Sequence, residues 1–81
     1  MDDNINILYP NKEMYQRICK NIAIKLKEIR LKNNMSQGEL SLEADCAKSY
    51  IGMIENGQKI PSIKLLTKLA TALKIDIRDF F

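Results

Sequence analysis

One segment constrains the fold of this 81-residue chain more than any other, namely residues 36–57, which read SQGELSLEADCAKSYIGMIENG. Ser36 stands three residues before Glu39, the spacing of a capping box, so a helix is predicted to begin there. The apolar residues that follow form two helical faces, which meet one core only if the chain breaks near Asp45. Asp tolerates the left-handed backbone conformation better than most residues that carry a Cβ atom. Gly57 then ends a second short helix, because Gly adopts a positive φ at low cost.

Two further helices flank this pair. Residues 14–33 carry apolar side chains at spacings of four, four and three, which predicts a long helix. Pro61 and Ser62 begin another helix that runs to Leu73, and Asp76 caps a last short turn. The predicted inward residues of these two helices are Ile18, Ile22, Leu26, Ile29, Leu65, Leu66, Leu69, Ala70 and Leu73. We therefore expect an all-α fold, a compact bundle of four to five helices over residues 14–81, preceded by an N-terminal extension over residues 1–13.

Length and composition exclude several classes of protein. A chain of 81 residues holds one domain and buries about 60–65% of its unfolded surface, which disfavours a deep catalytic cleft. No apolar run approaches the ~20 residues of a membrane span, and the N-terminus does not read as a secretory signal, so we expect a cytoplasmic protein. Cys19 and Cys46 are too few for a metal cluster, and the chain has no His. We expect buried, reduced thiols, with redox sensing as the lesser alternative, and we predict no catalytic residue, metal or cofactor.

The segment 36–57 and the helices that flank it resemble the Cro/repressor-type helix-turn-helix family of phage and bacterial regulators. The resemblance covers about residues 22–80 and rests on Arg30, Ser36, Gln37, Glu39, Leu40, Ser49, Tyr50, Ile51, Ile54, Glu55, Asn56, Gly57, Pro61 and Ser62. It implies a lambda repressor-like DNA-binding domain and a sequence-specific transcription regulator. The chain has Ser41, Asp45 and Ala47 where the family usually has Ala, Gly and a hydroxyl residue. Because Ala47 cannot cap the second helix of the pair, the start of that helix is expected to be weaker than usual.

The charge distribution agrees with a nucleic-acid partner. The net charge is +3, with six basic residues against one acidic residue over residues 17–32, and five against one over residues 48–74. On their own, such Lys-rich helices are more often merely solvated. Together with the resemblance, they favour Lys48, Lys59 and Lys64 as contacts to phosphate or bases.

The resemblance implies that the second helix of the pair lies in the major groove of DNA. Since Ile51 and Ile54 face the core, the predicted base-contacting residues are Lys48, Ser49, Gly52 and Met53. For Met53, simple space filling is an equal alternative. The predicted phosphate-contacting residues are Ser36, Gln37, Tyr50, Asn56, Gln58 and Lys59. Arg30 and Glu55 are expected to form a structural ion pair that orients one helix on the other.

A two-fold dimer is expected, because one recognition helix covers only half of a binding site. The predicted interface is the apolar C-terminus, namely Ile75, Ile77, Phe80 and Phe81. Alternatively Phe80 fills the core of the monomer, and the interface is formed by the N-terminal residues 5–9 or by Ile24 and Leu31. The latter two lie seven residues apart, off the core stripe, and simple exposure explains them equally well.

Several functional contexts remain open at this point. A controller protein, a prophage repressor and an antitoxin all fit a small DNA-binding regulator. A protein-interaction module with the same fold is the alternative from another class, but it would lack the outward donors at Gln37, Lys48, Ser49 and Asn56. The expected partners are double-stranded DNA and a second copy of the chain, without a membrane or an evident small-molecule ligand.

Overall fold

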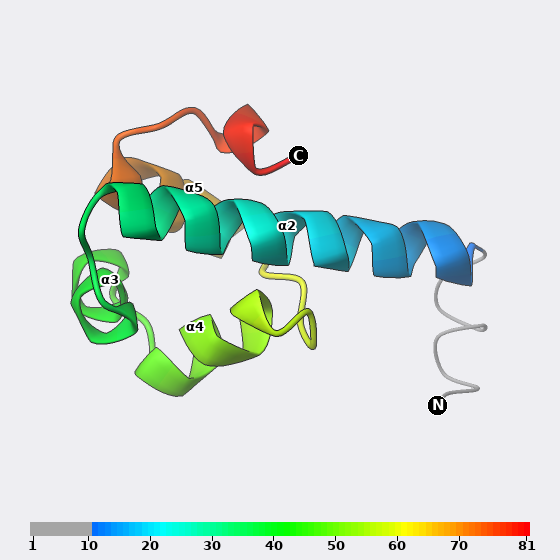
Figure 1. The fold of residues 1–81 in the computed structure, drawn as a ribbon, viewed down its shortest axis with the longest axis horizontal. Coiled ribbons are helices and arrows are strands. Elements are labelled where there is room, and N and C mark those ends of the chain that lie inside the picture. The colour runs from blue at the N-terminus through cyan, green and yellow to red at the C-terminus, as the bar shows by residue number, and fades with distance from the viewer. Residues whose placement is uncertain (1–10) are drawn as a thin grey trace.

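The computed structural model describes residues 11–81, which form four α-helices and a C-terminal 3-10 helix (Figure 1). The elements are α2 (Lys12–Lys32), α3 (Gln37–Ala44), α4 (Lys48–Glu55), α5 (Ile63–Leu73) and η1 (Ile77–Phe80). No strand occurs over these residues, so the prediction of an all-α fold is confirmed. None of the helices described is long and apolar enough to cross a membrane. The N-terminal segment considered as a dimer contact, residues 5–9, lies outside the described residues.

The long helix α2 begins two residues earlier than predicted, at Lys12 rather than Met14. Its N-cap is Asn11, whose side-chain oxygen accepts a hydrogen bond from the backbone N–H of Met14 at 2.8 Å. The helix therefore includes residues 12 and 13, which the sequence interpretation placed in the N-terminal extension. Asn three residues before the first apolar position was an available signal for this start.

The predicted capping box at the start of α3 is confirmed. The Ser36 hydroxyl accepts a hydrogen bond from the backbone N–H of Glu39 at 3.0 Å, and the Glu39 carboxylate accepts one from the N–H of Ser36 at 2.7 Å. The break between α3 and α4 is also where it was predicted, since Asp45 has φ 55° in the left-handed region. Gly57, with φ 76°, follows α4 as expected.

Helix α4 starts without a side-chain cap, as its sequence predicts, because its N-cap residue is Ala47. Ala47→Ser is expected to raise the free energy of unfolding by about 1 kcal/mol, since a hydroxyl there can accept from an N–H group without a partner. For a domain of this size the melting temperature should rise by about 4–8 °C, measured by circular dichroism. The converse control is Ser62→Ala, which removes the 3.1 Å cap bond to the N–H of Leu65 and should lower stability by a similar amount. An unchanged Ala47→Ser variant beside a destabilised Ser62→Ala variant would contradict the prediction.

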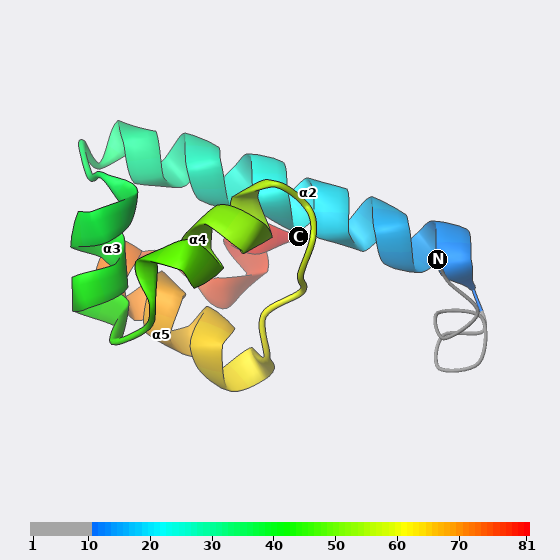
Figure 2. The same cartoon turned by 90° about the horizontal axis from the view of Figure 1, so that it is seen from below.

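The five elements enclose a single apolar core. Figure 2 shows α3 and α4 side by side under α2, with α5 against them, while the first turns of α2 project beyond the other elements. Of the predicted inward residues, Ile18, Ile29 and Leu65 are partly buried against the core. The fully buried cluster comprises Ile22, Leu26, Leu40, Ala44, Ile51, Ile54, Leu66, Leu69, Ala70, Leu73 and Phe80.

The position of Phe80 corrects one prediction. Its side chain is 0% exposed, because η1 folds back so that Phe80 enters the core between α2 and α5. Phe80 is therefore part of the core of the single chain, and the prediction that it forms a contact between subunits is wrong. The alternative considered for this residue, that it fills the monomer core, is confirmed.

Candidate nucleic-acid interface

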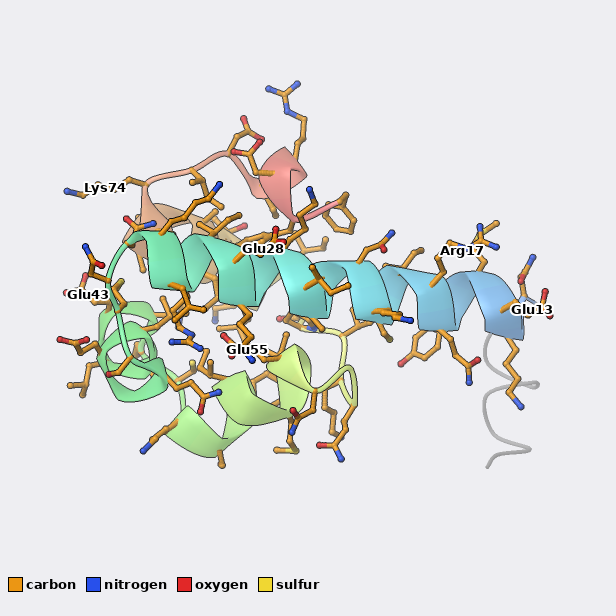
Figure 3. All side chains as sticks on the ribbon, viewed as in Figure 1. Glu13, Arg17, Glu28, Glu43, Glu55 and Lys74 are labelled. Atoms are coloured by element: carbon orange, nitrogen blue, oxygen red, sulfur yellow. The ribbon has the colours of Figure 1, made fainter. Side chains whose placement is uncertain are left out.

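A buried ion pair joins α2 to the end of α4. The Arg30 guanidinium donates to both carboxylate oxygens of Glu55, from Nε at 2.7 Å and from Nη2 at 3.0 Å. The two side chains are only 8% and 4% exposed, and Glu55 lies between α4 and α2 in Figure 3. Arg30 Nη1 also donates to the carbonyl oxygen of Met35, at 2.7 Å, in the loop before α3. The predicted structural pair is confirmed, and it ties α2, this loop and α4 together.

The hydrogen bonds to Glu55 raise the pKa of Arg30 above its usual value, although burial acts in the opposite direction. The guanidinium is therefore charged at every physiological pH. Its bonds to the carboxylate are of a charge-assisted, bidentate kind that fixes geometry as well as adding energy. The pair holds the recognition helix candidate, α4, in one orientation on α2.

Gln37 takes part in the same network, which the sequence interpretation did not foresee. Its side-chain Nε2 donates to Glu55 Oε1 at 3.1 Å. The residues lie 18 positions apart, so no local spacing indicates the bond. The amide carries a second N–H, and its oxygen faces Gly52, where a Cβ atom built on the glycine would lie 3.8 Å from Gln37 Oε1. Gln37 is thus held at the junction of α3 and α4, half-buried, with hydrogen-bonding capacity left over.

The outward face of α4 carries the residues predicted to contact bases. Ile51 and Ile54 are 0% exposed, which confirms that this side of α4 faces the core. Lys48 and Ser49 are exposed at its first turn, whereas Met53 is half-buried. A half-buried Gly52 precedes Met53 on the same helix.

Two helix N-termini meet beside these residues. The N–H groups of Gln37 and Gly38 donate no hydrogen bond to the described chain, and neither do those of Lys48 and Ser49. Lys48 crosses to the start of α3, since a Cβ atom on Gly38 would lie 3.9 Å from Lys48 Cδ. Because helix N-termini carry partial positive charge, the structure collects free donors and a cationic side chain on one side of α3 and α4.

The turn after α4 presents a second group of polar side chains. Asn56, Gln58 and Lys59 are all exposed there. The backbone N–H groups of residues 56–58 bond back to three carbonyl groups in the last turn of α4, which fixes the backbone of this turn. Tyr50, predicted to contact phosphate, is half-buried and packs against the core, and Ser36 uses its hydroxyl oxygen for the cap.

The remaining predicted residues divide by exposure. Ile75 and Ile77 are half-buried against the core, and Phe81 is 58% exposed at the chain end. Ile24 and Leu31 are exposed on α2, at 47% and 55%. The exposed apolar residues of this set therefore lie at the chain end and on α2.

Cys19 is buried and Cys46 half-buried, and both are free thiols. Burial raises the pKa of each thiol, so little reactive thiolate is present at neutral pH. Over residues 11–81, no group of three or more His, Cys, Asp or Glu side chains is placed to hold a metal ion.

The chain is similar to a known protein family and to several known proteins. A family model described as "Helix-turn-helix" matches residues 26–80. Control protein C.BamHI of Bacillus amyloliquefaciens is 39% identical over 56 residues, which is 68% of this chain and 69% of that protein. An uncharacterized HTH-type transcriptional regulator of Archaeoglobus fulgidus is 37% identical over 57 residues, or 70% of this chain and 80% of the relative. The crystal structure of the restriction-modification controller protein C.AhdI from Aeromonas hydrophila matches with a TM-score of 0.76 and 35% identity, covering 78% of this chain and 96% of that one.

Proposed function

This chain belongs to the helix-turn-helix family, and on that premise we propose that it is a DNA-binding transcription regulator whose helix α4 lies in the major groove. The observation that carries the proposal is the placement of Lys48 and Ser49, both exposed at the start of α4, beside the free N–H groups at the start of α3. In this position, two side chains able to read base edges adjoin donors able to hold the phosphate backbone. In such an arrangement the base contacts supply the sequence specificity, and the phosphate contacts set the position of the protein on the DNA.

Each exposed side chain then has a chemical role. Lys48 donates to guanine O6 and N7, and Ser49 donates to or accepts from a base edge. Met53 packs on a thymine methyl group from its half-buried position. Gly52, which would accommodate a Cβ atom within the fold, leaves the backbone of α4 uncovered toward the DNA.

The phosphate contacts come from both sides of α4. On one side, Gln37 uses the N–H that Glu55 does not occupy, together with the backbone N–H groups of the first turn of α3. On the other side, the exposed Asn56, Gln58 and Lys59 hold the opposite backbone, with Tyr50 at the flank of α4. The Glu55 carboxylate thus holds the Gln37 amide in place in the protein without DNA.

We propose that the active form is a two-fold dimer acting in the cytoplasm. One α4 covers half of a site, and two related by symmetry read half-sites about one DNA turn apart. The exposed Phe81, with Ile75 and Ile77 next to the core, is the favoured contact surface. Ile24 and Leu31 form the alternative surface.

Among the possible contexts, the comparisons favour a controller of a restriction-modification system. Control protein C.BamHI and controller C.AhdI are more similar to this chain than the ImmF control region protein of Bacillus phage phi105, which is 28% identical over 58 residues. C.AhdI also matches over nearly its whole length. A phage-type repressor remains the second candidate because of the phi105 relative.

Selection of bound duplexes from a random DNA pool tests the proposal. We expect a recovered site with two-fold symmetry and half-sites about one helical turn apart. Binding to that site should weaken steeply with salt, because each neutralised phosphate releases counterions. Sedimentation of the complex should show two protein chains on each duplex. Binding near background for every duplex at low salt would end the DNA hypothesis, and recovery of an asymmetric site bound by one chain would end the dimer hypothesis.

A further inference from the structure

The part of α2 that precedes residue 26 is not covered by the family match, which begins at that residue. Its first turns project beyond the other helices, and Glu13 and Arg17 mark this part of α2 in Figure 3. The match to the family therefore does not explain the residues of this part of α2. Two of them, Gln16 and Lys20, lie one helical turn apart and share a face of α2.

That face borders a groove of about 340 Å³ between α2 and the end of α4. Gln16, Lys20, Ala23 and Ile24 line it from α2. Glu55, Asn56 and Gly57 line it from the other side. The groove is consequently continuous with the turn after α4, where Asn56 is a proposed phosphate contact.

The polar groups around this groove favour an anion. Within residues 11–81, the side chains of Gln16, Lys20 and Asn56 make no hydrogen bond or ion pair, so three donor groups face the groove region without partners. The one carboxylate in the lining, Glu55, is paired with Arg30 and also accepts from Gln37. Its charge is therefore compensated inside the protein, and Lys20 supplies the uncompensated charge.

The end of α4 does not oppose an anion strongly. A helix C-terminus repels negative charge chiefly through carbonyl groups that lack hydrogen bonds. Here three carbonyls in the last turn of α4, those of Gly52, Met53 and Ile54, accept from the backbone N–H groups of residues 56–58. Ala23 and Ile24 give the groove its apolar lining, beside the polar side chains of Gln16, Lys20 and Asn56.

We propose that this groove binds a phosphate of the DNA backbone through Lys20, Gln16 and Asn56, and so extends the contact of the turn after α4. The inference rests on the proposed function, since it needs α4 in the major groove. Lys20 donates from its ammonium group, and the two amides donate from their NH₂ groups, to nonbridging phosphate oxygens. The contact adds affinity without reading sequence.

Lys20→Ala tests the proposal, with Lys25→Ala as the matched control. Both lysines are exposed on α2, but Lys25 does not line the groove. We expect Lys20→Ala to weaken binding about five-fold at low salt for the selected site and for unrelated duplexes alike. The slope of log K against log salt should fall in magnitude by about 0.9 for each phosphate that the variant no longer neutralises. Gln16→Ala should act in the same direction more weakly, and Lys25→Ala should match the wild type.

Phosphate ethylation interference locates the contact. We expect ethylation of one phosphate, the one whose interference also depends on Asn56, to weaken the wild type and not Lys20→Ala. The same interference pattern for both proteins, or equal affinities of the Lys20→Ala and Lys25→Ala variants, would overturn the inference while leaving the proposed function standing. If Lys20→Ala instead dissociates the free protein in sedimentation, the groove belongs to a second copy and the inference fails. Absence of DNA binding by the wild type would refute the proposed function, and this inference with it.

Discussion

Glu55→Ala is expected to lower the free energy of unfolding by about 3–5 kcal/mol, because it leaves the guanidinium of Arg30 buried without its counter-charge. The Arg30 side chain is 8% exposed, so little solvent reaches it, and the carbonyl of Met35 satisfies only one of its donors. Native domains are stable by about 5–15 kcal/mol, so this loss is a large share of the total. Urea unfolding followed by circular dichroism measures it directly.

Two further variants separate a buried pair from a solvent-exposed one. Arg30→Ala should also be strongly destabilising, since it leaves the Glu55 carboxylate with Gln37 as its single side-chain donor. The double variant should recover part of the loss, because it removes both charges together. Arg78→Ala is the matched control: its ion pair with Asp76 is exposed, with side chains 87% and 50% accessible, and its removal should change stability little. Small and additive effects of Arg30→Ala and Glu55→Ala would contradict this account.

The second large effect concerns DNA binding. Lys48→Ala is expected to cost about 1–3 kcal/mol on the preferred duplex, which is roughly a 5- to 150-fold loss of affinity, and to relax base preference at one or two positions of each half-site. The reason is that Lys48 is exposed at the first turn of α4, where a recognition helix reaches base edges. Repeating the selection from a random pool with the variant would show the change.

Gln37→Ala serves as the comparison for a contact without sequence information. Its amide adjoins the free N–H groups of α3, so its removal should weaken every duplex by a similar factor and leave the selected site the same. Glu55 keeps both bonds to Arg30 in this variant, so the fold should persist. A Lys48→Ala variant that selects the wild-type site would show that α4 is not placed in the groove as proposed.

Some contacts at the proposed site have no local signal in the sequence. The spacing of Ser36 and Glu39 predicted the start of α3, and the resemblance to the helix-turn-helix family implied the pairing of Arg30 with Glu55. Neither revealed that Gln37 donates to Glu55, because that bond depends on how α3 and α4 cross. The groove bordered by Lys20 and Asn56 was equally hidden, since these residues are 36 positions apart in the chain.

What the sequence alone determined about this protein is its helices, the inward face of each and most of their ends, the start of α2 excepted. Ser36, Ser62 and Gly57 act on backbone groups within about one turn, and the apolar spacing of a helix is a property of that helix by itself. Only the tertiary structure decided the place of Phe80, because its burial requires η1 to return onto α2, more than forty residues away along the chain. It likewise decided that Gln37 joins the buried ion pair and which side chains line the groove. Contacts of that kind depend on the packing of whole helices against one core, and no residue carries a local signal for them.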